Sequence, residues 1–202
     1  MKTEYGLIGA HLGHSYSREV HRALGNDDYR LLELTPGGVS DFLCKKDFSG
    51  VNVTIPYKEY VMPFLDRVDR HAAEIGAVNT VTVEDGKLCG YNTDYYGMRY
   101  WILTVLPTFT GRRVMILGGD GGTARSAAAV AKDLGAEAIF RVSRTPRDGF
   151  LPYEEAYAAD PDVLINATPV GMYPDMEHMP VKLSRFSRLG YVFDVIYHPQ
   201  RT

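Results

Sequence analysis

Arg113-Val-Met-Ile-Leu-Gly-Gly-Asp-Gly-Gly-Thr-Ala-Arg125 is the stretch that decides the fold of this chain. Its first five residues form an apolar run typical of a buried strand, and an alanine-rich helical segment ending near Leu134 follows the glycines. Gly119, Gly121 and Ala124 have the G-x-G-x-x-G/A spacing, in the strand–loop–helix setting that this motif requires. The stretch therefore predicts a Rossmann-like unit, whose glycines let a pyrophosphate approach backbone N–H groups at a helix N-terminus. The alternative is only a tight turn between strand and helix.

The segment after this helix carries residues that distinguish one dinucleotide from another. A strand expected at Ala138–Val142 ends in Ser143-Arg-Thr-Pro-Arg147. A cofactor with a free ribose 2′-hydroxyl usually meets an acidic residue at this position. Arg144 instead favours a 2′-phosphate, and therefore NADP, and Arg147 can assist because guanidinium groups match phosphate geometry. Either arginine could also be an exposed surface charge.

Strands and helices alternate along the rest of the chain, which is the pattern of an α/β protein. Pro107 ends a helix expected at Tyr95–Leu106, so we expect one domain in residues 1–106 and a second in residues 107–202. Asp85-Gly86 is a hairpin signal. The other expected strands are Tyr5–Gly9, Tyr29–Leu34, Val51–Ile55, Val163–Ala167 and Tyr191–Val195, and the other expected helices include Glu19–Leu24, Val39–Lys45 and Arg70–Ile75.

Gly50-Val-Asn-Val-Thr-Ile-Pro-Tyr-Lys58 is the part of the first domain that points most directly to chemistry. Alternating apolar residues up to Ile55 indicate a short strand, Pro56 forbids its continuation, and Lys58 follows the strand's end. A lysine placed there beside Thr54 could hold and protonate a hydroxyl-bearing substrate if a carboxylate joined it. A lone lysine of this kind is more often only solvated.

Three further polar residues have both a structural and a chemical interpretation. Asp94 follows the hairpin, and it could cap the helix that begins at Tyr95 or serve as the carboxylate partner of Lys58. Ser15 and Ser17 lie in a loop after the first strand, where Ser17 could be an N-cap and both hydroxyls could bind a carboxylate or a hydroxyl group. The residues alone leave these alternatives open.

The composition argues against several classes of function. With 202 residues, a net charge of -3 and scattered Lys and Arg, the chain is not expected to bind nucleic acid. No apolar run approaches the span of a bilayer and the start lacks the apolar core of a signal peptide, so we expect no membrane partner and a cytoplasmic location. His11, His14 and His21 lack companions at ligand spacing, so no metal is expected, and Cys44 and Cys89 are expected to be buried thiols.

Seven motifs occur in one order through essentially the whole chain. They are Gly13-His-Ser-Tyr-Ser17, Asn52-Val-Thr-Ile-Pro-Tyr-Lys58, Ile75-Gly-Ala-Val-Asn-Thr80, Gly90-Tyr-Asn-Thr-Asp94, Gly119-Asp-Gly-Gly-Thr-Ala-Arg125, Asn166-Ala-Thr-Pro-Val-Gly-Met172 and Asp194-Val-Ile-Tyr-His-Pro199. Together they resemble the shikimate dehydrogenase family, including its shikimate/quinate type. The resemblance implies an NADP-linked enzyme of aromatic amino-acid biosynthesis that reversibly reduces 3-dehydroshikimate to shikimate. It also implies an N-terminal α/β substrate domain followed by a Rossmann-like dinucleotide-binding domain, with the active site in the cleft between them.

The resemblance also assigns roles to residues at the matching positions. Lys58 and Asp94 would be the catalytic pair, with Lys58 donating the proton in the direction of reduction. The residues that would bind substrate are Ser15 and Ser17 at its carboxylate, Thr54, Asn79 and Asp94 at its ring hydroxyls, and Tyr197 in the pocket wall. The residues that would bind NADP are Gly119, Gly121, Gly122, Thr123, Ala124, Ser143, Arg144, Thr145, Arg147, Asn166, Thr168 and Met172.

The sequence departs from the family pattern at several positions. Arg18 replaces a usual proline and Ser143 a common asparagine, while Asp120 occupies a glycine-loop position where a small neutral residue is usual. A carboxylate there would repel pyrophosphate unless it pointed away. The chain ends at Thr202, where family members continue with further helices, so we expect a C-terminally shortened member.

Two other functions remain open at the level of sequence. One is a shortened, non-catalytic paralogue that binds shikimate or a nucleotide, and the other is a quinate/shikimate dehydrogenase that uses NAD. In each case the expected partner is a small molecule, and the expected assembly is a monomer or a homodimer.

Overall fold

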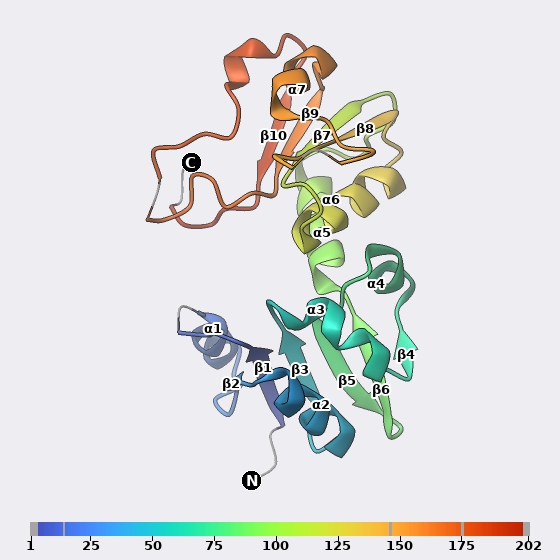
Figure 1. Ribbon diagram of the computed structural model, residues 1–202, viewed down its shortest axis with the longest axis vertical. Coiled ribbons are helices and arrows are strands. Elements are labelled where there is room, and N and C mark those ends of the chain that lie inside the picture. Colours follow the sequence, from blue (N-terminus) through green and yellow to red (C-terminus); the bar gives the residue numbers. More distant parts are fainter. Residues whose placement is uncertain (1–3, 14, 146, 175, 200–202) are drawn as a thin grey trace. The chain divides into compact units, whose positions relative to one another are not determined.

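The computed structural model describes residues 4–13, 15–145, 147–174 and 176–199 (Figure 1). His14 and residues 200–202 of the sequence predictions lie outside these ranges. The chain forms two compact units, Met1–Thr93 and Asp94–Thr202. Helix α5 (Thr93–Val105) belongs almost entirely to the second unit, whereas the boundary expected from Pro107 would have assigned it to the first.

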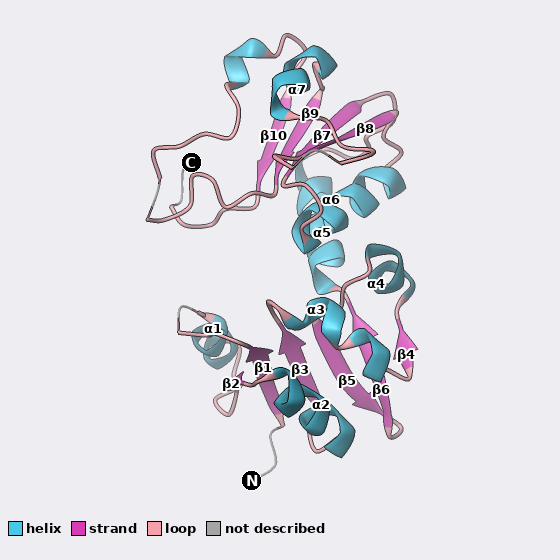
Figure 2. Ribbon diagram, in the orientation of Figure 1, coloured by secondary structure: helices cyan, strands magenta, loops and turns pink. Residues whose placement is uncertain are grey.

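The first unit is built on a six-stranded sheet in the order β2-β1-β3-β5-β6-β4. Neighbouring strands are parallel except at β5, which is antiparallel to both β3 and β6. Its strands are β1 (Tyr5–Gly9), β2 (Arg30–Glu33), β3 (Gly50–Val53), β4 (Arg67–Val68), β5 (Thr80–Glu84) and β6 (Lys87–Tyr91). Its helices are α1 (Ser17–Ala23), α2 (Pro36–Lys45), α3 (Tyr57–Tyr60), the 3-10 helix η1 (Met62–Phe64) and α4 (Arg70–Ile75) (Figure 2).

Alternating apolar side chains build the core of this unit. Val51 and Val53 of β3 are buried with Ile8 of β1, and the apolar face of α2 packs on the same cluster through Leu43. Helix α2 begins at Pro36 because Thr35 is its N-cap, with the hydroxyl of Thr35 accepting a hydrogen bond from the N–H of Gly38 at 3.3 Å. The hairpin predicted from Asp-Gly is confirmed, since β5 and β6 are joined by residues of positive φ.

The second unit is a parallel four-stranded sheet in the order β10-β9-β7-β8. Its elements after α5 are β7 (Arg113–Leu117), α6 (Gly122–Asp133), β8 (Ala138–Val142), α7 (Tyr153–Ala159), β9 (Val163–Asn166), the 3-10 helix η2 (Leu183–Arg185) and β10 (Tyr191–Asp194). Four consecutive residues of β7, Val114–Leu117, are fully buried. Such a run is expected of a central parallel strand with both faces covered, so the predicted Rossmann-like arrangement is confirmed.

Several local predictions from the sequence are wrong. Ile55 is 77% exposed because β3 ends at Val53 and the chain turns before α3. Ser17 is the first helical residue of α1 and Tyr16 holds the N-cap position, so Ser17 is not the cap. Cys44 is exposed, because it lies beside Leu43 on α2 but on the helix face that points away from the core.

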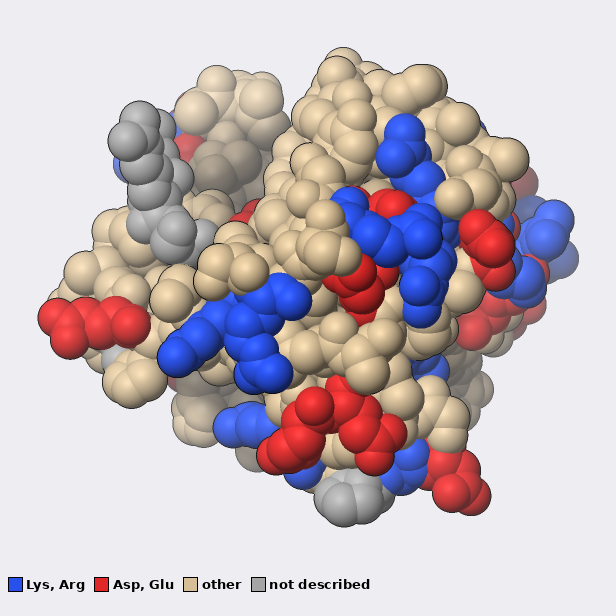
Figure 3. Space-filling view, turned by 90° about the horizontal axis from the view of Figure 1, so that it is seen from above, with Lys and Arg blue, Asp and Glu red and all other residues tan. Residues whose placement is uncertain are grey.

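Charged side chains of both signs lie close together on the surface. On the face drawn in Figure 3, Lys and Arg side chains are interspersed with Asp and Glu side chains. Among the described residues, no helix is both long and apolar enough to cross a membrane. In the same ranges, His, Cys, Asp and Glu side chains form no group of three that could hold a metal ion.

Candidate active site

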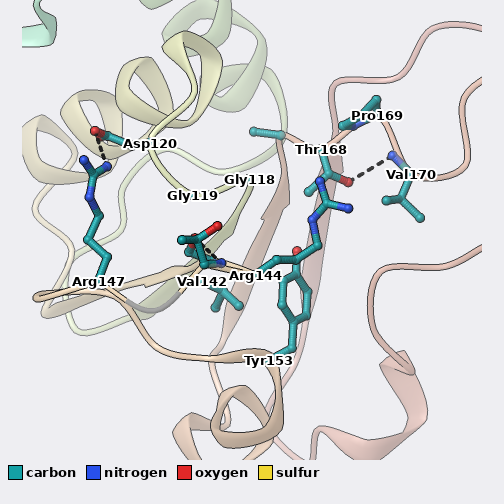
Figure 4. Close-up of a pocket in the computed structure, with 13 residues that line it drawn as sticks. Gly118, Gly119, Asp120, Val142, Arg144, Arg147, Tyr153, Thr168, Pro169 and Val170 are labelled. Atoms are coloured by element: carbon teal, nitrogen blue, oxygen red, sulfur yellow. Dashed lines mark hydrogen bonds and ion pairs between the residues drawn. The ribbon is translucent and has the colours of Figure 1, made fainter.

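A cavity of about 460 Å³ lies in the second unit, where the loops that follow β7, β8 and β9 meet (Figure 4). Because these strands are parallel, their carboxyl ends lie at one edge of the sheet, which is where ligands bind in such folds. The residues that line the cavity are Gly118, Gly119, Asp120, Val142, Ser143, Arg144, Thr145, Arg147, Tyr153, Ala167, Thr168, Pro169 and Val170.

The glycine loop has a backbone shape that side chains would prevent. Gly118 has φ +128°, and a Cβ built on it would lie 2.7 Å from the carbonyl oxygen of Ala167. Gly119 has φ +60° and donates its N–H to the carbonyl of Val142 at 2.9 Å, which holds the loop against the end of β8. Gly121 is the N-cap of α6 in extended conformation. The loop therefore leads the backbone over the sheet edge and directly into a helix N-terminus, which is an arrangement that binds phosphate.

The loop after β8 presents one hydroxyl and two guanidinium groups. The Oγ of Ser143 accepts the N–H of Thr145 at 3.1 Å, which fixes the turn from which Arg144 and Arg147 project. Arg144 extends across the cavity toward Thr168, whereas Arg147 turns to the other side and meets Asp120 (Figure 4). The two arginines predicted to bind a 2′-phosphate therefore line one cavity but point in different directions.

The third wall of the cavity is organised by Asn166 at the end of β9. Its Oδ1 accepts both the N–H and the hydroxyl of Thr168, at 3.1 and 2.7 Å, and its Nδ2 donates to Asp194 at 3.1 Å. The hydroxyl of Thr168 in turn accepts the N–H of Val170 at 3.2 Å. Asn166 is buried behind the cavity wall, and its contacts hold in place the Thr168 loop that forms the wall.

The predicted cofactor residues separate into two groups. Those that line the cavity are Gly119, Ser143, Arg144, Thr145, Arg147 and Thr168. Those that the described lining does not include are Gly121, Gly122, Thr123 and Ala124 at the start of α6, Asn166 behind the wall, and Met172, which is exposed.

Tyr153 is a lining residue that the sequence did not reveal. It is the first residue of α7, a helix with only two buried residues and hence little periodic signal. Burial raises the pKa of its phenol, and the nearby charge of Arg144 partly offsets that increase. Tyr153 therefore stays a neutral hydroxyl at physiological pH.

In the first unit, several predicted substrate residues gather at one edge of the sheet. Thr54 directly follows β3, and its N–H bonds the carbonyl of Ile8 at 2.9 Å. Gly9 at the end of β1 makes room for this contact, since a Cβ there would lie 2.8 Å from the Cγ2 of Thr54. The backbone carbonyl of Lys58 accepts the N–H of Val78 at 2.8 Å. That bond holds the start of α3 next to Val78, the residue before Asn79.

Asn79 is held in one orientation by its own hydrogen bonds. Its Oδ1 accepts the N–H of Thr93 at 2.8 Å and the hydroxyls of Thr93 and Thr80, each at 3.1 Å. Because the oxygen is engaged by three donors, the amide NH₂ is the group left to donate to a ligand. Asn79 is only 7% exposed, so its side chain is held by its neighbours at the sheet edge and has little contact with solvent.

The serine loop presents two hydroxyls that contact each other. The Oγ of Ser15 lies 3.1 Å from the Oγ of Ser17 and accepts the N–H of Ser17 at 3.2 Å. Both side chains are partly buried. Ser15, and not Ser17, thus satisfies the backbone at the start of α1, and the two hydroxyls form one polar pair.

The other two predicted residues belong to the second unit. Asp94 is the second residue of α5 and is partly buried, and Tyr197 follows β10 with 76% of its surface exposed. Their predicted contacts with substrate stay predictions.

Comparison with known proteins gives consistent results for sequence and structure. Residues 7–81 match the family model described as the shikimate dehydrogenase substrate binding domain. A shikimate dehydrogenase (NADP(+)) of Clostridium beijerinckii is 39% identical over 98% of this chain and 79% of its own.

Two solved structures share the arrangement of the chain. A chorismate mutase/shikimate 5-dehydrogenase fusion protein from Clostridium acetobutylicum matches with TM-score 0.88 and 33% identity, over 100% of this chain and 80% of that one. Shikimate 5-dehydrogenase from Thermus thermophilus, in complex with NADP(H) and shikimate, matches with TM-score 0.81 and 29% identity over 97% and 79%.

Proposed function

This chain belongs to the shikimate dehydrogenase family, and we propose that it reversibly reduces 3-dehydroshikimate to shikimate with NADP, using Lys58 and Asp94 as its catalytic pair. The observation that carries the proposal is the cavity of the second unit, in which a glycine loop at a helix N-terminus shares one space with two arginines. The Clostridium beijerinckii relative is named for the same cofactor, and the Thermus thermophilus relative holds NADP(H) together with shikimate.

The residues of the cavity fit a phosphorylated dinucleotide. A Cβ on Gly118 would meet the carbonyl oxygen of Ala167, and one on Gly119 would meet the Oγ of Ser143, so glycine at both positions lets the loop take its path to the N-terminus of α6. A pyrophosphate can bind the first N–H groups of such a helix. Arg144 and Arg147 supply guanidinium groups for a 2′-phosphate. When bound, NADPH supplies the hydride that converts the substrate carbonyl into an alcohol.

The polar edge of the first unit fits a small hydroxylated acid. We assign the pair of hydroxyls from Ser15 and Ser17 to the substrate carboxylate, and the hydroxyl of Thr54 and the amide NH₂ of Asn79 to its ring hydroxyls. Because Asn79 is already oriented by three donors, it binds substrate without a further entropic cost of becoming ordered. We assign Asp94 to a ring hydroxyl as well, and Tyr197 to the wall of the substrate pocket.

Lys58 supplies the proton that reduction requires. As hydride reaches the carbonyl carbon, negative charge develops on the carbonyl oxygen and must be met by a proton. The ammonium Nζ of Lys58 donates that proton and becomes a neutral amine, which solvent then protonates again. In the direction of oxidation, the amine takes the proton from the hydroxyl. Asp94 steers the ammonium by charge and accepts a hydrogen bond from the neighbouring hydroxyl.

Steady-state kinetics of Lys58→Ala tests this assignment. We expect kcat to fall by about 10²- to 10⁴-fold with a much smaller change in KM, because the proton is needed only in the transition state. Lys45→Ala is the matched control, since Lys45 is an exposed lysine in the same unit. A kcat for Lys58→Ala equal to that of the control would exclude the role of Lys58.

A non-catalytic binding module is the second candidate. It predicts that the folded chain binds shikimate in calorimetry yet forms no NADPH from shikimate at alkaline pH. Protein-dependent NADPH formation that disappears in Lys58→Ala would exclude it.

Rates with shikimate and quinate, each with NADP and NAD, separate the two types of dehydrogenase. Sedimentation of the same sample distinguishes the monomer from the homodimer.

A further inference from the structure

Asp120 stands in the middle of the glycine loop, and its carboxylate is occupied by two arginines. Its Oδ1 accepts a hydrogen bond from Nη2 of Arg141 at 2.6 Å, and its Oδ2 accepts one from Nη1 of Arg147 at 2.7 Å. These are charge-assisted bonds of short length, which belong to the strong class of protein hydrogen bonds. The acidic side chain is therefore neutralised by the protein and does not face a bound pyrophosphate as a free charge.

The partners of Asp120 differ in how firmly they are fixed. Arg141 also donates from Nη2 to the carbonyl of Gly119 at 3.3 Å, lies over the ring of Phe150 at 4.2 Å, and has 27% of its side chain exposed. Arg147 has 54% exposed and lies 5.6 Å from the same ring. Arg141 is thus a built-in structural partner, whereas Arg147 is the less constrained group that a ligand can recruit.

We propose that Asp120 is a specificity-determining residue that competes with the cofactor's 2′-phosphate for Arg147 and so weakens the preference of this chain for NADP over NAD. The inference rests on the proposed function, since it concerns the same cofactor site. The cavity lining includes the carboxylate of Asp120 and the guanidinium groups of Arg144 and Arg147. Arg144 alone points into the space before Thr168, while the guanidinium of Arg147 is turned to Asp120 (Figure 4).

The competition acts on the 2′-phosphate more than on the rest of the cofactor. Each guanidinium has five donors in a planar fork, and a phosphate binds best when two parallel donors face it. The bond to Asp120 uses Nη1 and holds the guanidinium turned toward the glycine loop, so Arg147 can present its Nη1/Nη2 fork to a 2′-phosphate only by giving up or sharing that bond. A dinucleotide with a free 2′-hydroxyl makes no such demand, so its affinity is less affected. The pKa of Asp120 is lowered, chiefly by the hydrogen bond from Arg141, so the carboxylate stays charged at physiological pH.

Calorimetric titration with NADP⁺ and with NAD⁺ tests the proposal without catalysis. We expect the ratio of the two association constants to rise about two- to fivefold in Asp120→Ser, the range set by an exposed ion pair. Asp120→Asn, which removes the charge but keeps the shape of the side chain, should raise the ratio in the same direction. If Asp120 acts through Arg147, adding Asp120→Ser to an Arg147→Ala chain should leave the ratio of that chain unchanged.

Three results would overturn the inference. An unchanged or lower ratio in both Asp120 variants would show that the carboxylate does not compete, or that it positions Arg147 for the phosphate. An equal rise in the Arg147→Ala background would show that Arg147 is not the contested group. If the unsubstituted chain bound neither dinucleotide, the proposed function would fail and the inference with it, and this outcome is distinct from binding with an unchanged ratio.

Discussion

Gly118→Ala should destabilise the second unit, because this glycine has no room for a side chain. At φ +128°, an ideal Cβ would lie 2.7 Å from the carbonyl oxygen of Ala167, 3.0 Å from its carbonyl carbon and 3.3 Å from its Cβ. The two closest atoms are backbone, and Ala167 is held in turn by its N–H bond to the carbonyl of Leu117 at 2.9 Å. The contact can therefore be relieved only by moving the ends of β7 and β9 apart.

Two costs add to give the size of the effect. A non-glycine residue in a sparsely populated region of positive φ costs about 1–3 kcal/mol. Forcing a methyl group into a packed site costs roughly another 1–3 kcal/mol. The expected loss is therefore about 2–6 kcal/mol, a large part of the roughly 5–15 kcal/mol that stabilises an ordinary domain. Because the displaced strand ends carry the cavity walls, NADP affinity should fall as well.

Trp101 provides the measurement. It is the single tryptophan of the chain and lies on α5 with its ring 5.3 Å from that of Phe193 on β10, so its fluorescence reports unfolding of the second unit. Urea unfolding of Gly118→Ala should show a lower midpoint than that of the unsubstituted chain. Gly122→Ala is the control, since a Cβ there would meet no described heavy atom within 4 Å. It should change stability by no more than about 1 kcal/mol. Equal midpoints for the two variants would refute the steric argument.

Three further changes test other parts of the structure. Asn79→Ala removes the acceptor of three hydrogen bonds and should lower the free energy of unfolding by about 1–3 kcal/mol, measured by circular dichroism in urea. Tyr95→Phe removes a hydroxyl that donates to Asp133 at 2.6 Å, and should lower the fluorescence-detected stability of the second unit by about 1.5–3 kcal/mol. The pKa of Asp66 in the folded chain is lowered, chiefly because its carboxylate accepts a hydrogen bond from the backbone N–H of Leu88. A carboxyl whose pKa is lowered by folding adds stability above its unfolded pKa of 3.8, and this stability is lost as the pH falls through the folded pKa. Acidification below about pH 4 should therefore destabilise the unsubstituted chain more steeply than Asp66→Asn.

The sequence predicted the regular elements well where burial is strong. The strand Arg113–Leu117, buried from Val114 onward, begins and ends where expected, because a short apolar run followed by glycines favours a buried strand. Ala138–Val142 also has the expected bounds, although only Val142 of this strand is buried. The elements that escaped prediction include β4, which has two residues, the three-residue 3-10 helix η2, and α7, which buries only Ala156 and Ala159. Such short elements are held by tertiary contacts, so they leave little periodic signal in the sequence.

The site was predictable where a motif fixes the backbone and not where side chains meet across the chain. The glycine loop was found from spacing, and the structure gives a reason for two of its glycines, since Gly118 and Gly119 have positive φ values that other residues rarely adopt. The pairing of Asp120 with Arg141 and Arg147 joins residues 21 and 27 positions apart, and nothing in the local pattern indicates it. The expected conflict between Asp120 and pyrophosphate is thereby replaced by a competition for Arg147.

Strand direction explains why the two units place their polar residues differently along the chain. In the all-parallel sheet of the second unit, the cavity residues on the loops after β7, β8 and β9 all follow their strands. In the first unit β5 runs against its neighbours, so the edge reached by the ends of β1, β3 and β6 is reached by the start of β5. Asn79 accordingly precedes its strand while Thr54 follows its own, and the bond from Val53 N–H to the carbonyl of Asn79 at 2.8 Å joins the two positions. A sequence search limited to residues after strands would therefore find Thr54 and Lys58 but miss Asn79, which reaches the same edge from the start of β5.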